Sequence, residues 1–260
     1  MGTNLITLEY AGPVAIISNN RPEKHNAAND EMDEGLRSIL EELSRNPDVR
    51  AAIWRANGKS WSSGRDVGQI GVRTEDIDNL AFIERGQGAM KALLDLQIPI
   101  LCALKGWVIG GSFERSLCCD LRIASADTSF MLPEVKHGVI TDTGGMARLF
   151  QICGHGVTMD LILTGRTMDV EEALRHGIVS RVVPPDQLEE TALEMAKGIA
   201  ASPAFTVKMA RRNMGLLANK LVVDSIQEEA TTQTLVFASQ DYAEMKAAKS
   251  QGREPKYRRR

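Results

Sequence analysis

The chain has 260 residues and a formal net charge of −3, with 43% hydrophobic and 25% charged residues. This composition is typical of a folded globular protein and excludes a disordered chain. The small net charge provides no field that would draw nucleic acid or an anionic membrane onto the whole surface, so we expect neither as a partner.

The cysteines lie in apolar stretches, with no CxxC spacing and no histidine cluster beside them; they are Cys102, Cys118, Cys119 and Cys153. This pattern predicts reduced core residues rather than a metal site. The first residues lack the basic and apolar regions of a secretory leader, and no apolar run reaches the roughly 18 residues of a membrane span. We therefore expect a cytoplasmic protein.

The first part of the chain alternates β-rich runs with amphipathic segments. Runs at 5–9 and 14–18, separated by Ala-Gly-Pro, predict a hairpin. Residues 29–44 carry apolar side chains at helical spacing and acids in the first turn, which predicts a helix. Further strands are predicted at 49–56, 98–104 and 121–125, and further helices at 76–96, 111–118 and 145–153. This alternation indicates an α/β fold.

The last part of the chain is predicted to be helical. Segments 188–201, 203–217 and 221–249 have helical patterns, with proline near two of the starts. We expect an α/β core over 1–200 and a helical region over 201–260.

Three loops join a strand end to a helix start, at 61–66, 106–114 and 133–145. Helix starts carry unpaired N–H groups, and glycine there lets the backbone approach a ligand. Nucleotide hydrolysis loses support because Gly58-Lys59-Ser60 lacks the upstream glycine of a phosphate-binding loop. Serine esterase chemistry loses support because the sequence has no GxSxG motif.

Four segments, in order and spacing, resemble those of the enoyl-CoA hydratase/isomerase (crotonase) family. They are Arg-Pro-Glu-Lys-His-Asn-Ala at 21–27, Ser-Gly-Arg-Asp at 63–66, Gly-Gly at 110–111, and Pro-Glu at 133–134 followed by Gly-Gly at 144–145. The resemblance covers nearly the whole chain. It implies a crotonase-like spiral of repeated ββα units with a helical C-terminal region, which would join a homotrimer or a dimer of trimers. It also implies an acyl-CoA substrate with no metal or redox cofactor.

The resemblance further implies that the backbone N–H groups of Arg65 and Gly111 bind the thioester oxygen. Such donors matter because the reaction builds enolate charge on that oxygen. The chain departs from the family at two positions: Arg65 replaces a small residue, and Ser112 replaces a third glycine. Both N–H groups survive these changes. We hypothesise that the long Arg65 cation reaches an anionic group such as a CoA phosphate.

The resemblance implies that Glu114 and Glu134 form the catalytic pair of a hydratase. One carboxylate would deprotonate water and one carboxylic acid would protonate the α carbon. Two such groups in a dry pocket favour a singly protonated pair. The alternative is structural: Glu114 would pair with Arg115 or Lys105, and Glu134 would cap a loop.

Asp142 leaves several alternatives open. It is either the N-cap of a helix starting near Gly144 or a third acid of the kind that dienoyl-CoA isomerases carry. An enoyl-CoA hydratase is the leading expectation. The alternatives are an isomerase, a carnitinyl-CoA dehydratase-like enzyme, and a catalytically silent acyl-CoA-binding paralogue.

The resemblance also implies a coenzyme A site near the early loop and the Ser-Gly-Arg-Asp turn. The residues expected there are Lys24, Ala27, Ser63, Asp66 and Val67.

Overall fold

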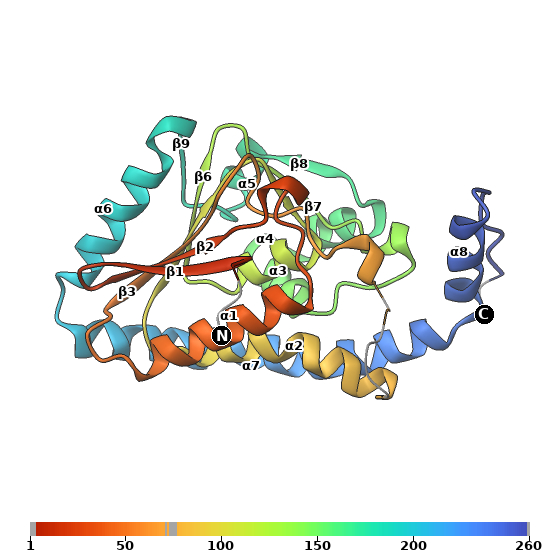
Figure 1. Cartoon of the computed structure of the whole chain (residues 1–260), viewed down its shortest axis with the longest axis horizontal. Coiled ribbons are helices and arrows are strands. Elements are labelled where there is room, and N and C mark those ends of the chain that lie inside the picture. The colour runs from red at the N-terminus through yellow and green to blue at the C-terminus, as the bar shows by residue number, and fades with distance from the viewer. Residues whose placement is uncertain (1–3, 71, 73–76, 259–260) are drawn as a thin grey trace.

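The computed structural model describes residues 4–70, 72 and 77–258, and in it the strands form two sheets (Figure 1). The larger sheet runs in the order β1 (Ile6–Ala11), β2 (Val14–Asn19), β3 (Ala51–Ala56), β4 (Ile100–Leu104), β6 (Leu121–Ser125) and β9 (Arg181–Val183). The predicted hairpin is the antiparallel pair β1–β2, and the other neighbours are parallel. The smaller sheet contains β5 (Trp107–Ile109), β7 (Ser129–Met131) and β8 (Thr167–Asp169).

Helices follow most of the strands, which confirms the predicted α/β alternation. They are α1 (Asp30–Arg45), α2 (Asn79–Asp95), α3 (Gly110–Leu117), α4 (Gly145–Thr164), α5 (Val170–Arg175), α6 (Leu188–Ala200), α7 (Ala204–Ala238) and α8 (Gln240–Ser250). Short 3-10 helices lie at Pro22–Lys24, Val67–Gln69, Glu134–His137 and Pro185–Gln187.

Successive side chains of each strand in the larger sheet point to opposite faces, and each face packs into its own hydrophobic core. One face packs Val14, Ile53 and Leu101 against Leu188 and Ala192 of α6. The other face belongs to a separate core that contains the buried side chains of α1, α2 and α3. In Figure 1, α6 accordingly lies on one side of the strands, and α1 and α2 lie on the other.

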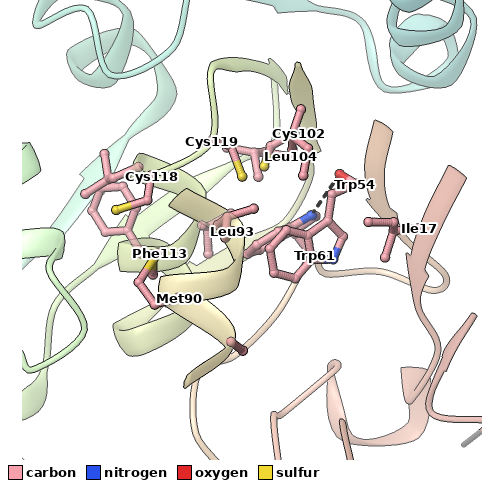
Figure 2. Close-up of a cluster of buried hydrophobic side chains, with 14 of the residues drawn as sticks. Ile17, Trp54, Trp61, Met90, Leu93, Cys102, Leu104, Phe113, Cys118 and Cys119 are labelled. Atoms are coloured by element: carbon pink, nitrogen blue, oxygen red, sulfur yellow. Dashed lines mark hydrogen bonds between the residues drawn. The ribbon is translucent and has the colours of Figure 1, made fainter. Parts of the chain in front are cut away.

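Two tryptophans and three cysteines fill part of this second core (Figure 2). Trp54 and Trp61 pack with ring centroids 5.0 Å apart, and the Trp61 indole N–H donates to the Trp54 carbonyl at 3.3 Å. Cys102, Cys118 and Cys119 are free and buried, as the sequence predicts, whereas Cys153 is half-buried. The aromatic pair fixes the strand end that leads into the 61–66 turn.

Some predicted boundaries are wrong. The helix predicted at 76–96 begins at Asn79 after the N-cap Asp78, and residue 76 lies outside the described residues. The helix predicted at 145–153 continues to Thr164 across a kink at Gly154. The sequence did not predict β7, β8, α5 or β9, because elements of three to six residues are too short to show a period.

The C-terminal helices divide at a different place from the one predicted. A break was expected between 217 and 221, but α7 is one helix of 35 residues. Ala-Asn-Lys at 218–220 does not break it, because none of these residues forces a non-helical backbone. The chain turns instead at Ser239, whose hydroxyl accepts from Tyr242 N and caps α8.

The long helix α7 runs beneath α1 and α2 and ends near α8 (Figure 1). Its buried stripe consists of Val222, Ile226, Glu229, Ala230 and Gln233. Two residues of this stripe, Glu229 and Gln233, are polar and bring hydrogen-bonding groups to the interior. Among the residues that the structure describes, no helix is both long and apolar enough to cross a membrane.

Candidate active site

A cavity of about 990 Å³ lies where the strand-to-helix loops meet. Its wall is formed by residues of α1, α2, α3 and α7 and of the 63–70 and 131–143 segments. Four of the five residues expected to be catalytic lie close together on it: Arg65, Gly111, Glu114 and Glu134. The fifth, Asp142, lines the same cavity. The loops that the sequence singled out therefore form one site.

The first backbone donor comes from the turn at 63–66. Ala28 forms an isolated parallel bridge with Arg65, in which Ala28 N donates to Gly64 O at 2.7 Å and Ala28 O accepts from Asp66 N at 2.8 Å. In such a bridge the hydrogen bonds go to the residues flanking the opposite one, whose own N–H points away. Within the described part of the chain the Arg65 N–H has no protein acceptor. This N–H is available to a ligand oxygen.

The second donor lies in the first turn of α3, where backbone N–H groups have no intrahelical acceptor. Gly111 follows Gly110, which has a φ of +58°. A Cβ on Gly110 would lie 2.7 Å from Glu134 Oε1, and a Cβ on Gly64 would lie 2.9 Å from Ile109 O. Glycine at 64 and 110 thus lets the turn, the start of α3 and the Glu134 carboxyl group approach each other closely.

Glu114 lies one turn into α3 and is 1% exposed. Its Oε2 accepts from Thr143 N and from Gly145 N, both at 3.0 Å. Burial raises the pKa of Glu114 well above its usual range, and the charges of Glu134, Glu229 and Asp142 add to this.

The structural alternative for Glu114 is wrong. Arg115 pairs with Asp33 instead, at 2.6 Å between Nη1 and Oδ1. Lys105 lies 3.8 Å from a carboxylate oxygen of Glu189. Neither cation forms an ion pair with Glu114.

Glu134 opens the 3-10 helix at Glu134–His137. Its Oε1 lies against Gly110, and its Oε2 is buried without a hydrogen-bond partner among the described residues. Burial raises its pKa to about 7, and the charge of Asp142 acts in the same direction. An unpartnered carboxyl oxygen with this pKa is suited to exchange a proton with a ligand near neutral pH.

Asp142 is a further acid on the cavity wall, partly buried, rather than a helix cap. The N-cap of α4 is Gly144, with no side-chain hydrogen bond, so the cap interpretation is wrong. Burial raises the pKa of Asp142 to about 7; the charge of Glu229 raises it further, and Arg115 and Arg65 oppose the shift.

Glu229 of α7 was not predicted from the sequence; it does not line the cavity but holds the loop that carries Asp142. It is 4% exposed. Its Oε2 accepts from Gly144 N at 2.8 Å, and its Oε1 accepts from the Ser225 hydroxyl at 2.6 Å. Its place in the buried stripe of α7 is the signal that could have found it, because a carboxyl on an apolar helix face needs a polar partner.

A sequence model of the family described as enoyl-CoA hydratase/isomerase matches residues 9–259. The chain belongs to the enoyl-CoA hydratase/isomerase family. A protein of Mycobacterium bovis named as a probable enoyl-CoA hydratase is 33% identical over 98% of this chain and 98% of its own. The short-chain-enoyl-CoA hydratase of Clostridium acetobutylicum is 33% identical over 82% of this chain and 81% of its own.

Solved structures of the enoyl-CoA hydratase/isomerase family share the fold. The crystal structure of an enoyl-CoA hydratase/isomerase from Pseudoalteromonas atlantica has a TM-score of 0.89, covers 98% of this chain and 100% of that one, and is 26% identical. The predicted crotonase-like α/β fold with a helical C-terminal region is confirmed.

The Arg65 guanidinium group pairs with two acids of α1, and the hypothesis that it reaches a CoA phosphate stays a prediction. Nη1 lies 2.9 Å from Asp33 Oδ2, and Nη2 contacts Asp30 Oδ1. The acids at the start of α1, which the sequence analysis assigned only to the helix terminus, supply these partners.

The five residues expected at the coenzyme A site lie on neighbouring segments. Ser63 and Val67 line the cavity. Ser63 N donates to His25 O, and the Ser63 hydroxyl donates to Lys24 O at 3.3 Å, which joins the turn to the early loop. Asp66 accepts from Arg21 Nη1 at 3.0 Å, and Arg21 Nη1 also donates to Ala27 O at 3.0 Å. The family's coenzyme A role for these residues stays a prediction.

Proposed function

We propose that this protein hydrates an α,β-unsaturated acyl-CoA thioester. The single observation that carries the proposal is the meeting of Glu114, Glu134 and the two peptide donors at one cavity wall. Glu134 Oε1 lies against the glycine that precedes the Gly111 donor. A thioester oxygen bound there would bring its α and β carbons beside the two carboxyl groups.

The proposed reaction begins with the thioester oxygen bound by the N–H groups of Arg65 and Gly111. One carboxylate takes a proton from water while the water oxygen bonds to the β carbon. The electron pair of the double bond moves toward the thioester oxygen, where each donor contributes about 3 kcal/mol to stabilising the enolate. The other carboxyl group then delivers its proton to the α carbon.

We assign the two carboxyl groups by their hydrogen bonds. Glu114 Oε2 accepts two peptide N–H groups, which stabilise its carboxylate against the burial and the neighbouring charges that raise its pKa, and on this ground we assign Glu114 as the general base. Glu134 has a pKa of about 7 and an oxygen without a partner, so it is the general acid. After one turnover the proton has passed from Glu134 to the product, and Glu114 holds the proton from water. Exchange with solvent restores the pair.

The test is the loss of enoyl-thioester absorbance when the purified protein is added to crotonyl-CoA. Glu114→Gln and Glu134→Gln should each lower kcat by between about a hundredfold and ten-thousandfold, because each removes a proton-transfer group. Arg45→Ala, which removes an exposed 3.6 Å pair with Glu41 on α1, serves as the control with unchanged rate. Wild-type binding of the thioester without any absorbance loss would refute hydration.

Asp142 favours a second candidate, a double-bond isomerase. Its carboxyl group lines the same cavity and has a pKa of about 7, matching Glu134. Two acids whose pKa values are both raised to about 7 suit the removal of a proton from one carbon and its return to another. We rank this activity second because it does not use Glu114, whose carboxyl group is held by the N–H groups of Thr143 and Gly145.

We also infer a homo-oligomer, with α7 contributing to the interface. Apolar side chains along its first half and near its end are exposed, at 73% for Phe205, 78% for Leu217 and 67% for Leu235. Association of copies would bury them. Trimeric assembly, the oligomerising role of 201–260 and the cytoplasmic location remain predictions.

A further inference from the structure

The two positions at which this chain departs from the pattern that the resemblance implies both lie at the backbone donors. Arg65 itself provides the first donor, and Ser112 follows the Gly111 donor. Gly110 and Gly111 form the most pliable backbone of the site. The backbone bonds that join the two segments, Ser62 N to Trp107 O at 3.0 Å and Ile109 N to Ser62 O at 3.1 Å, end before this glycine pair. Beyond Ile109, side chains must fix the second donor.

The first connection is a buried pair of hydroxyl groups. Ser62 and Ser112 are 2% and 5% exposed, and their Oγ atoms are 2.7 Å apart. Ser62 has a single O–H, which it donates to Asn26 O at 2.7 Å, so Ser112 is the donor between the two hydroxyls. Ser62 Oγ also accepts from Gly64 N at 3.2 Å. Through Ser62, the hydroxyl of residue 112 is thereby tied to the Gly64 N–H, one peptide before the one that carries the Arg65 N–H.

The second connection is ionic and passes through α1. Asp33 bridges two guanidinium groups: Oδ2 lies 2.9 Å from Arg65 Nη1, and Oδ1 lies 2.6 Å from Arg115 Nη1. Arg115 stands four residues after Gly111, on the same face of α3. The side chains of Asp33 and Arg115 are 15% and 11% exposed, so water screens this bridge less than it screens a surface pair.

We propose that Ser112 and Arg65 are positioning residues that hold the peptide N–H groups of Arg65 and Gly111 at a fixed separation. The effect of these residues on rate rests on the proposed hydration function. A chain with glycine at 112 and a small residue at 65 would have neither connection. Donors that are held in place before the charge develops need no reorganisation when it does, and a displacement of about 1 Å at such a site costs about a hundredfold in rate.

The neighbouring charges are consistent with this role. Asp30 accepts from Arg65 and also lies 3.4 Å from Arg85 of α2. The guanidinium groups of Arg65, Arg85 and Arg115 therefore share the two carboxylates of Asp30 and Asp33. The Arg65 side chain is engaged with α1 while its backbone N–H is free.

The variants that test the proposal are Ser112→Ala, Arg65→Ala and their combination, with Arg45→Ala on α1 as the matched control. The probe is butyryl-CoA labelled with ¹³C at the thioester carbonyl, which cannot be hydrated. Isotope-edited infrared spectra report how strongly the two donors polarise the carbonyl. We expect a band lowered from its solution position in the wild type, moved part of the way back in each single variant, and moved furthest in the double variant.

Kinetics on crotonyl-CoA provide the second measurement. We expect kcat to fall about tenfold in each single variant and up to about a hundredfold in the double variant, with KM within about twofold of the wild type. Arg65→Lys, which keeps a cation near Asp33, should recover part of both signals. Thermal unfolding of every variant identifies loss of folding.

The infrared band and the kinetic constants together separate the possible outcomes. An unchanged band in both single variants, with or without a lower melting temperature, would overturn the proposal. A raised KM at unchanged kcat in Arg65→Ala would also overturn it, in favour of a ligand contact. A wild type that hydrates nothing but polarises the carbonyl, with relaxation in the variants, would support the proposal while refuting hydration. A wild type that shifts no carbonyl band would refute both.

Discussion

Replacement of Gly145 by alanine tests how closely the catalytic helix and its neighbour approach. A Cβ at this position would lie 2.3 Å from Glu114 Cγ, 2.4 Å from Glu114 Cβ and 2.7 Å from Glu114 Cα. No rotamer change relieves a clash with a backbone carbon, so α3 and α4 must separate. Separation also weakens the 3.0 Å bonds from Thr143 N and Gly145 N to the Glu114 carboxylate.

The expected loss follows from these contacts. Overpacking costs about 1–3 kcal/mol, and a hydrogen bond to a charged group contributes about 1.5–3 kcal/mol. With one such bond lost, we expect Gly145→Ala to lower the free energy of unfolding by about 2.5–6 kcal/mol. Glu114 would also move relative to the donors, so kcat should fall by at least about a hundredfold.

Urea denaturation followed by circular dichroism measures the stability, and crotonyl-CoA hydration measures the activity. Gly156→Ala is the control in the same helix, because no atom lies within 4 Å of its added Cβ. It should raise stability by up to about 1 kcal/mol and leave activity unchanged. Wild-type stability in Gly145→Ala would refute the close approach of α3 and α4.

Two further predictions concern the remaining acids. The pKa of Glu134 in the folded protein is about 7, above the ordinary 4.5, so this carboxyl favours folding most below pH 4.5 and loses that contribution as pH rises through about 7. Glu134→Gln should therefore raise the free energy of unfolding at about pH 8 by up to about 3 kcal/mol, and change it little near pH 4. Equal urea midpoints for the wild type and Glu134→Gln at about pH 8 would contradict this prediction. Asp142→Asn should lower hydration of crotonyl-CoA by less than about tenfold if Asp142 only adjusts its neighbours, whereas a proton-shuttling isomerase would lose more than about a hundredfold on a dienoyl-CoA substrate. Rates on both substrates decide between the two activities.

The sequence predicted the elements that are long and strongly patterned. The acidic first turn and the apolar face of residues 29–44 predict α1 to within one residue at each end, and the paired runs at 5–9 and 14–18 predict the hairpin. The smaller sheet was not predicted, because strands of three residues carry no measurable alternation. The position of the α7–α8 junction depends on one hydroxyl cap at Ser239, which resembles many other serines in the sequence.

The site was predictable where glycines mark close approach, and less so where side chains meet across the fold. The glycine pairs and their following glutamates indicated the donors and two acids. Glu229 was missed because its partner, Gly144 N, is remote in sequence and is a backbone group. The ion pairs of Arg65 were not predicted because Asp30 and Asp33 have an adequate local explanation at the start of α1.

The loop at 140–145 is held by hydrogen bonds to α7 as well as to α3. Ile140 N donates to Gln233 Oε1 at 2.7 Å, Gly144 N donates to Glu229, and Gln87 donates both to Asp142 O and to Ile226 O. A chain emerging from the ribosome has already made both peptide donors and both glutamates when α7 is still unsynthesised. It nevertheless lacks the groups that hold this loop, so catalysis should begin only after α7 has been synthesised. Incomplete chains would therefore add protein without adding activity.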